Sequence, residues 1–184
     1  MTTDAAVLEL GVGDYRLRPL VWDDVEALVR HADNPNVAAN LRDAFPSPYR
    51  REDAENWIAA ATAVDPPFVL AIADASELVG IVGLVLQTDV FRRSAEIGYW
   101  LGESRWGRGI ATAATRRFTE YAFDTFDLVR IYAGVYESNP ASARVLEKAG
   151  YTCEGRLRRS VTKRGRTVDE FLYARVLAED RAED

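Results

Sequence analysis

A short glycine-containing segment, residues 105–112, has the residue types of an anion-binding turn. It reads Arg105, Trp106, Gly107, Arg108, Gly109, Ile110, Ala111 and Thr112. Because it leads from a strand-like run into a helical pattern, its backbone N–H groups would converge at the positive end of a helix dipole. Gly107 and Gly109 would let a phosphate approach the backbone closely. The segment therefore predicts a phosphate or pyrophosphate site. A tight strand-to-helix connection without a ligand is the alternative.

Two other phosphate motifs fit this segment less well. A P-loop requires Gly-Lys-Ser/Thr, which is absent, and a dinucleotide-binding fingerprint should open a βαβ unit. Here the glycines follow three consecutive strand-like runs that predict an antiparallel meander. In the third run, residues 95–101, the apolar series alternates with Glu96, Gly98 and Trp100, so Glu96 should point to the face opposite the apolar residues.

Hydrophobic periodicity predicts the elements that position these residues. Helical spacing indicates helices at 21–31, 52–63 and 112–126, and a fourth helix of about ten residues between the N-cap Asn139 and Gly150. Strand patterns cover 15–20, 68–73, 78–87, 95–101, 128–136, 152–160 and 168–176. Residues 33–50 read as a loop with one helical turn. Residues 1–13 carry no element and are expected to be poorly ordered. The order predicts one α/β domain, residues 1–184, with a mixed sheet.

Composition narrows the class of protein. With 184 residues and 48 % apolar content the chain can bury a core, and its net charge of −6 disfavours general nucleic-acid binding. Neither a leader pattern nor a membrane-length apolar run is present, so a cytoplasmic protein without membrane contact is expected. Cys153 is expected to be a buried thiol, and His31 is interpreted as structural. No residue pattern indicates a metal site.

Several motifs together resemble the GNAT superfamily of N-acetyltransferases, and within it the ribosomal-protein-alanine N-acetyltransferase (RimJ/RimL-like) branch. The likeness covers nearly the whole domain. The family's cofactor motif, Gln/Arg-x-x-Gly-x-Gly/Ala, aligns with Trp106, Gly109 and Ala111 in its first, fourth and sixth places, and Trp106 departs from it. The ribosomal branch often has Trp-Gly-x-Gly-Ile-Ala, which matches. The other motifs are Leu17-Arg18-Pro19-Leu20, Ala95-Glu96-Ile97-Gly98-Tyr99-Trp100-Leu101, Asn139-Pro140-Ala141-Ser142 and Glu147-Lys148-Ala149-Gly150-Tyr151.

The resemblance implies a fold and a cofactor site. The fold is a mixed, mostly antiparallel sheet of six to seven strands flanked by four helices, with two splayed parallel central strands at 95–101 and 128–136. The cosubstrate is acetyl-CoA, with no metal. Its pantetheine arm would insert between these strands, beside the backbone of Tyr99, Trp100 and Leu101. The pyrophosphate would lie on Trp106, Gly107, Arg108, Gly109, Ile110, Ala111 and Thr112, and Asn139 would also contribute.

The resemblance also implies direct attack by a neutral amine on the thioester, which requires a base and an acid. Glu96 is the candidate base, through a water. Its alternatives are a solvated carboxylate or a partner for Arg92 or Arg93. Many relatives have a tyrosine as acid where this chain has Leu146. The ribosomal branch instead resembles Asn-x-x-Ser, so Ser142 is the candidate acid, with Asn139 as its companion. Helix capping is the alternative for Asn139 and an ordinary helix position for Ser142. Tyr99, Tyr132 and Tyr136 are the other candidates for the acid.

The acceptor is less defined by the sequence. The leading hypothesis is a primary amine, either a peptide N-terminus, which the branch favours, or a small amine, with loop 33–50 and Trp57 near the acceptor. Six basic residues between 156 and 166 form either a solvated hairpin or a patch that attracts an acidic or phosphate-bearing substrate. A non-catalytic acyl-CoA-binding sensor or assembly module and a nucleotide-binding regulator are the rival functions. Oligomeric state stays open, and a homodimer is one possibility.

Overall fold

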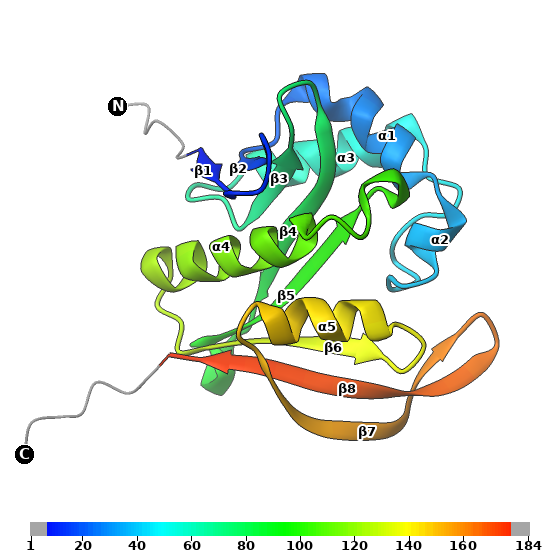
Figure 1. Ribbon diagram of the computed structural model, residues 1–184, viewed down its shortest axis with the longest axis vertical. Coiled ribbons are helices and arrows are strands. Elements are labelled where there is room, and N and C mark those ends of the chain that lie inside the picture. The colour runs from blue at the N-terminus through cyan, green and yellow to red at the C-terminus, as the bar shows by residue number, and fades with distance from the viewer. Residues whose placement is uncertain (1–6, 178–184) are drawn as a thin grey trace, which may run out of the picture.

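The protein is built on one eight-stranded sheet, seen in a computed structural model that describes residues 7–177 (Figure 1). The strand order is β1-β2-β3-β4-β5-β6-β8-β7. The strands are β1 (Leu8–Glu9), β2 (Arg16–Arg18), β3 (Val69–Ala73), β4 (Leu78–Leu86), β5 (Ser94–Leu101), β6 (Arg130–Tyr136), β7 (Thr152–Lys163) and β8 (Arg166–Val176). The α-helices are α1 (Val25–Ala32), α2 (Pro35–Ala38), α3 (Arg51–Thr62), α4 (Ile110–Thr125) and α5 (Pro140–Lys148). The mixed, mostly antiparallel α/β fold is confirmed.

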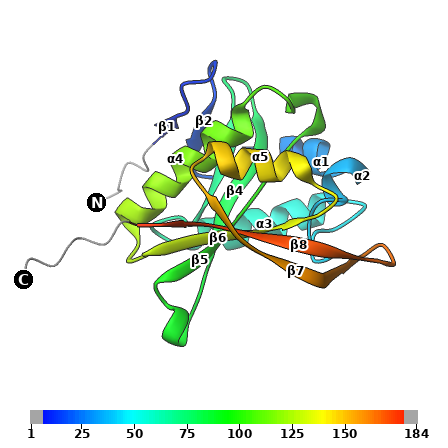
Figure 2. The same cartoon turned by 60° about the horizontal axis from the view of Figure 1, so that its bottom comes forward.

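A gap between β5 and β6 is the central feature of the sheet. These strands are parallel and pair only where Ser94–Glu96 lie beside Arg130–Tyr132. Beyond that point they diverge, β5 continuing beside β4 and β6 beside β8. The two arms of the resulting V are plain in Figures 1 and 2. The expectation of splayed parallel central strands is therefore confirmed.

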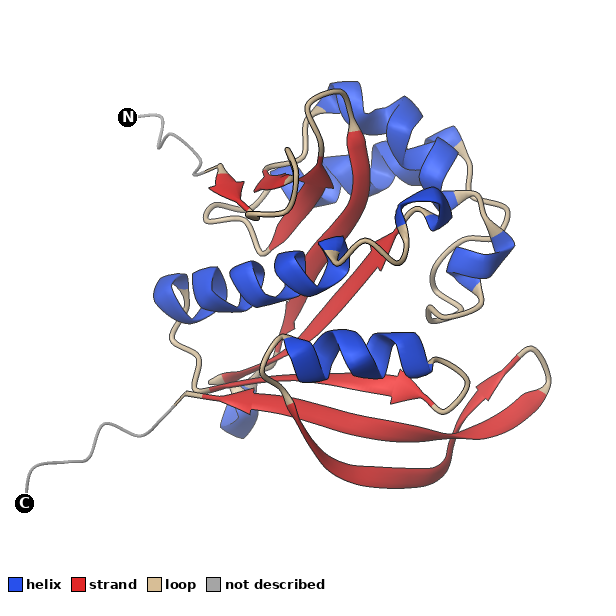
Figure 3. Ribbon diagram, in the orientation of Figure 1, coloured by secondary structure: helices blue, strands red, loops and turns tan. Residues whose placement is uncertain are grey.

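Helices cover both faces of the sheet, and two hydrophobic clusters hold them there (Figure 3). On one face α4 and α5 pack on alternate residues of the strands, with Phe118 and Leu146 fully buried. On the other face α1 and α3 pack on the intervening residues of β3 and β4, such as Ala71 and Ile81. The alternation of β5 sets Ile97 on the α4 and α5 face, whereas Trp100 packs against the α1 and α3 cluster. No helix within residues 7–177 is long and apolar enough to cross a membrane.

The fold corrects some sequence expectations. An eighth strand, β1, lies inside the segment 1–13 that was expected to lack order; at two residues it is too short for a periodic signal, and only its pairing with Leu17 and Arg16 defines it. Residues 1–6 lie outside the described part. Cys153 is exposed rather than buried, because it lies on β7, the edge strand of the sheet. His31 has a structural role as expected, with its Nε2 3.1 Å from Glu77 Oε1.

A buried hydroxyl in α4 yields a stability prediction. Thr115 Oγ1 is buried and has no hydrogen-bond partner among the described residues, whereas Thr119 Oγ1 donates to the Thr115 carbonyl at 2.7 Å and lies 2.7 Å from Tyr151 Oη. Thr115→Val should raise the free energy of unfolding by about 1 kcal/mol, because it removes an unpaired polar group at constant shape. Thr119→Val is the matched control and should lower it by a similar amount. Urea denaturation measures both, and a loss of stability in Thr115→Val would contradict the assignment.

Candidate functional site

A cavity of about 900 Å³ opens at the gap between β5 and β6. Its walls come from the loop after α2, from α3, from the turn before α4 and from α5, β4, β6 and β8. Of the three tyrosines considered as acids, Tyr99 and Tyr136 line it and Tyr132 does not. The residues assigned to catalysis or cofactor binding all line it: Glu96, Tyr99, Trp100, Leu101, Trp106, Gly107, Arg108, Gly109, Ile110, Ala111, Thr112, Asn139 and Ser142. Segments as far apart as residues 37 and 170 thus share one cavity.

The glycine turn ends at the N-terminus of α4. Gly107 and Gly109 have φ values of +75° and +79°, which other residues rarely adopt, and Gly109 is the N-cap of the helix. A Cβ at either position would touch nothing, so the need for glycine is conformational. No side chain caps the helix, which leaves the N–H groups of its first turn toward the cavity. Because α4 begins at Ile110, earlier than expected, Ile110, Ala111 and Thr112 form this first turn. Such a turn fits a phosphate.

Trp106, which departs from the family's usual Gln or Arg, ties the turn to the sheet. Its Nε1 donates a hydrogen bond to the Leu101 carbonyl at 2.7 Å, while the side chain remains 44 % exposed. The indole therefore fixes the turn relative to the end of β5 and occupies one acceptor of Leu101. This bond supplies a structural reason for Trp at this place.

The side of β5 that faces the gap offers unpaired backbone. Beyond Glu96, no strand within residues 7–177 pairs with this side, although β4 pairs with the other side as far as Leu101. Buried backbone N–H and C=O groups need partners. An extended chain that carries amide groups could therefore pair with β5 in the gap, much as an added strand would.

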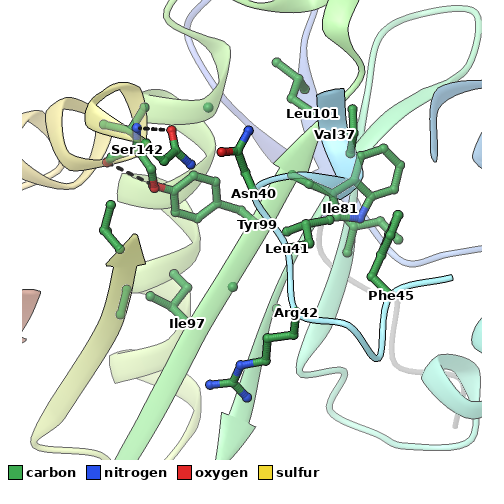
Figure 4. Close-up of a pocket in the computed structure, with 18 of the residues that line it drawn as sticks. Val37, Asn40, Leu41, Arg42, Phe45, Ile81, Ile97, Tyr99, Leu101 and Ser142 are labelled. Carbon is green, nitrogen blue, oxygen red and sulfur yellow. Dashed lines mark hydrogen bonds between the residues drawn. The ribbon is translucent and has the colours of Figure 1, made fainter. Parts of the chain in front are cut away.

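A chain of hydrogen bonds joins β5 to α5 on the α4 and α5 face (Figure 4). Tyr99 Oη lies 2.8 Å from Ser142 Oγ and also donates to the Ser142 carbonyl at 3.3 Å. Asn139 Oδ1 accepts from the Ser142 backbone N–H at 3.2 Å, so the capping interpretation of Asn139 is confirmed. Burial raises the pKa of the Tyr99 hydroxyl well above its usual value, opposed by the bond to Ser142. Both hydroxyls therefore stay protonated at neutral pH and can donate hydrogen bonds.

Glu96 lies on the opposite face of the sheet and pairs with an arginine. Its partner is Arg42 from the loop after α2, with Nη2 and Oε1 2.5 Å apart, and not Arg92 or Arg93, which the sequence offers as alternative partners. Arg93 instead pairs with Asp127, because it lies where β5 begins. Burial lowers the pKa of the Arg42 guanidinium, but the charge and the hydrogen bond of Glu96 raise it, together with smaller effects of Tyr136 and Glu170, and the net shift is upward. The Glu96 side chain is 20 % exposed and that of Arg42 is 68 % exposed, so the pair opens to solvent on the arginine side.

The two faces give the cavity two ends of different charge. The end near α4 and α5 has the basic residues Arg108, Arg144 and Lys148, and the other end has the acidic residues Glu96 and Glu170 with the basic Arg42. Sequence reasoning missed Arg42, Arg144 and Glu170, because none lies in a motif, and it gave no role to Lys148 within the motif 147–151. Trp57 and the loop 33–50 are expected near the acceptor, and Trp57 and residues of the loop line the cavity. Leu146 is fully buried in the core and does not reach the cavity.

Three of the six basic side chains on the hairpin between β7 and β8 have partners among the described residues. Arg156 binds Asp169, Lys163 Nζ lies 2.6 Å from Asp43 Oδ1 and Arg164 donates to the Pro35 carbonyl at 3.1 Å. The last two contacts join the hairpin tip to the loop that follows α2 and to the first residue of α2. Within residues 7–177 no group of three His, Cys, Asp or Glu side chains could hold a metal ion.

Comparison with known proteins agrees with this geometry. The model of the family "Acetyltransferase (GNAT) domain" matches residues 15–152. The chain belongs to the GNAT family of acetyltransferases. Enzymes of this family use acetyl-CoA as their cosubstrate, and the glycine turn, the helix N-terminus and the open edge of β5 fit its pyrophosphate and its amide-containing arm.

Individual relatives show the same likeness. The GNAT chain is 32 % identical to the uncharacterized N-acetyltransferase p20 of Bacillus licheniformis over 58 % of its own length, and 31 % identical to the ribosomal-protein-serine acetyltransferase of Escherichia coli over 55 %. It spans 60 % and 56 % of the length of these two proteins. The structure of Mycobacterium smegmatis RimJ in complex with CoA-disulfide superposes with a TM-score of 0.80 at 28 % identity, covering 97 % of this chain and 89 % of RimJ.

Proposed function

We propose that the protein transfers an acetyl group from acetyl-CoA to a primary amine, with a peptide N-terminus as the favoured acceptor. The observation that carries the proposal is the joint placement of three features in one cavity: an uncapped helix N-terminus, an open strand edge and the side chains of Glu96 and Ser142. The cosubstrate supplies the acetyl group as a reactive thioester. The remaining chemistry falls to the protein's own side chains and backbone.

The α4 and α5 face would hold the cosubstrate. Backbone N–H groups from Gly107 to Thr112 would bind the pyrophosphate, with Arg108 and the missed Arg144 and Lys148 adding positive charge. The backbone of Tyr99, Trp100 and Leu101 would pair with the amides of the arm, and the Trp106 indole would keep the turn and strand in register. Asn139 would act through Ser142, by holding the first turn of α5 in place.

The opposite face would hold the acceptor. Glu96 is the proposed base for the ammonium, directly or through a water, and it must exchange its contact with Arg42 for the acceptor. Ser142 would donate a hydrogen bond toward the leaving sulfur. Tyr99, which lies 2.8 Å from it, can replenish or replace that donor. The gap between β5 and β6 connects the two faces, so the amine and the thioester can meet there.

Turnover on an amine panel tests the proposal. The wild-type protein should release CoA from acetyl-CoA with peptides that have a free N-terminus and not with the same peptides blocked at the N-terminus. The E. coli relative is named a ribosomal-protein-serine acetyltransferase, which supports this acceptor class. If acetyl-CoA raises the melting temperature of the protein but no amine is acetylated, the result would favour the non-catalytic acyl-CoA-binding module instead. Protection by ATP or NAD and none by CoA would favour a nucleotide-binding regulator.

A further inference from the structure

A second carboxylate, Glu170, shares the acceptor face of the sheet with Glu96. Glu96 on β5 lies beside Tyr132 on β6, and Glu170 on β8 lies opposite Tyr136. Because Tyr132 and Tyr136 are four residues apart on one strand, they point to the same face, and so do their partners. Both carboxylates also line the one cavity. The sheet register thus brings two acidic groups from separate strands to the same end of the site.

The glycine at position 134 leaves room for the Glu170 side chain. Gly134 lies on β6 between the two tyrosines, and a Cβ there would collide with the Glu170 carboxylate. The carboxylate therefore extends along β6 toward Glu96. Gly134 is two residues from Tyr132, which is roughly 7 Å along a strand. Glu170 thus lies near the candidate base at the same end of the cavity.

Glu170 forms no ion pair with another side chain within residues 7–177. Within residues 7–177 the basic side chain at this end of the cavity, Arg42, lies within 4.0 Å of Glu96, and none comes that close to Glu170. Arg42 nevertheless responds to both carboxylates: burial lowers its pKa, and the charges of Glu96 and Glu170 raise it. A cation is therefore stabilised at this end, and the chain's own arginine shows that a guanidinium fits there.

We propose that Glu170 is a specificity-determining residue that pairs with a second positive charge on the acceptor. The proposal rests on the proposed function and names its substrate class, an amine with another cationic group several ångströms away. In this arrangement Glu96 faces the reacting amine and Glu170 holds the second charge. The second charge can come from a basic side chain near a peptide N-terminus or from a small diamine. An amine with one charge would leave the Glu170 carboxylate unpaired.

Matched acceptors test this assignment. Cadaverine and hexylamine differ in one terminal ammonium, and two peptides that differ only in Lys or norleucine at the second position form the other pair. The wild type should prefer the charged member of at least one pair about tenfold in kcat/KM, the value of one modest ion pair. The pair that shows the preference identifies whether the second positive charge comes from a peptide side chain or from a small diamine. Equal rates within both pairs would overturn the proposal while leaving the proposed function intact. No turnover of any amine would overturn both.

Variants locate the preference. Glu170→Gln should raise KM for the preferred acceptor about tenfold, leave its kcat within about twofold and bring the pair to near equality. Glu170→Asp should restore part of the preference. Gly134→Ala keeps the charge but displaces the carboxylate, so it should also reduce the preference. Glu9→Gln, an exposed charge change on β1, is the control and should alter neither pair. An equal effect of Glu170→Gln on both members of a pair would contradict a role in recognition.

Discussion

Replacing Glu96 with glutamine should lower kcat by about 100- to 10,000-fold, the usual contribution of a general base. Glutamine has nearly the same shape and can still accept a hydrogen bond from Arg42, so the substitution removes proton acceptance with little change in packing. The effect should fall on kcat because the carboxylate handles a proton in the transition state. Steady-state release of CoA, measured with a saturating amine, gives this value directly.

Cosubstrate affinity provides the control for this variant. Glu96 lies on the face of the sheet opposite Tyr99 and Ser142, whereas the glycine turn lies at the start of α4. Acetyl-CoA should therefore protect Glu96→Gln against heat as well as it protects the wild type. A kcat within threefold of the wild type, with this protection intact, would show that Glu96 is not the base and would leave its pair with Arg42 as its role.

Phe118→Ala should lower the free energy of unfolding by about 3–5 kcal/mol, the largest effect on stability that we expect from one side chain. Phe118 is fully buried where α4 packs on the sheet, and its ring centroid lies 5.7 Å from that of Tyr121. Truncation leaves a cavity beneath the same helix that carries the glycine turn. Urea denaturation measures the loss, and weaker protection by acetyl-CoA should accompany it.

An exposed phenylalanine serves as the control. Phe91 in the β4–β5 connection is 67 % exposed, so Phe91→Ala should change the free energy of unfolding by less than about 0.5 kcal/mol. If Phe118→Ala costs no more than this control, α4 is not held by the packing seen in the structure. An unfolded variant would still agree with the prediction, because a loss of this size is a large fraction of the stability of an ordinary domain.

Much of the fold could be predicted because its elements are periodic. The alternation of residues 95–101 correctly separates Glu96 from Ile97, and Asn139, Pro140 and Gly150 correctly bound the helix α5. Such signals are local and depend on a few neighbouring residues. The strand β1 and the exposure of Cys153 could not be predicted in this way, since both depend on where a strand lies in the sheet.

The candidate site likewise contains residues that local motifs predict and residues that only the folded structure brings in. The glycine turn and the Asn139–Ser142 pair belong to contiguous motifs, which sequence resemblance can identify. Arg42 and Glu170 belong to none, and they join the site only through the loop after α2 and the pairing of β8 with β6. The bond from Trp106 to Leu101 is short in sequence, yet it depends on the single 3-10 turn Glu103–Arg105 between the two residues, which no periodic pattern predicts. Long-range register therefore supplies the part of the site that we propose binds the acceptor.

The contacts of Lys163 with Asp43 and of Arg164 with Pro35 limit how this protein can be re-engineered. They join segments 120 and 129 residues apart in the chain, so neither segment is an independent module. A hairpin transplanted alone from a relative would meet a loop that does not match it, and the mouth of the acceptor end would change shape unpredictably. Chimeras meant to exchange acceptor preference should therefore carry residues 33–50 and the β7–β8 tip together.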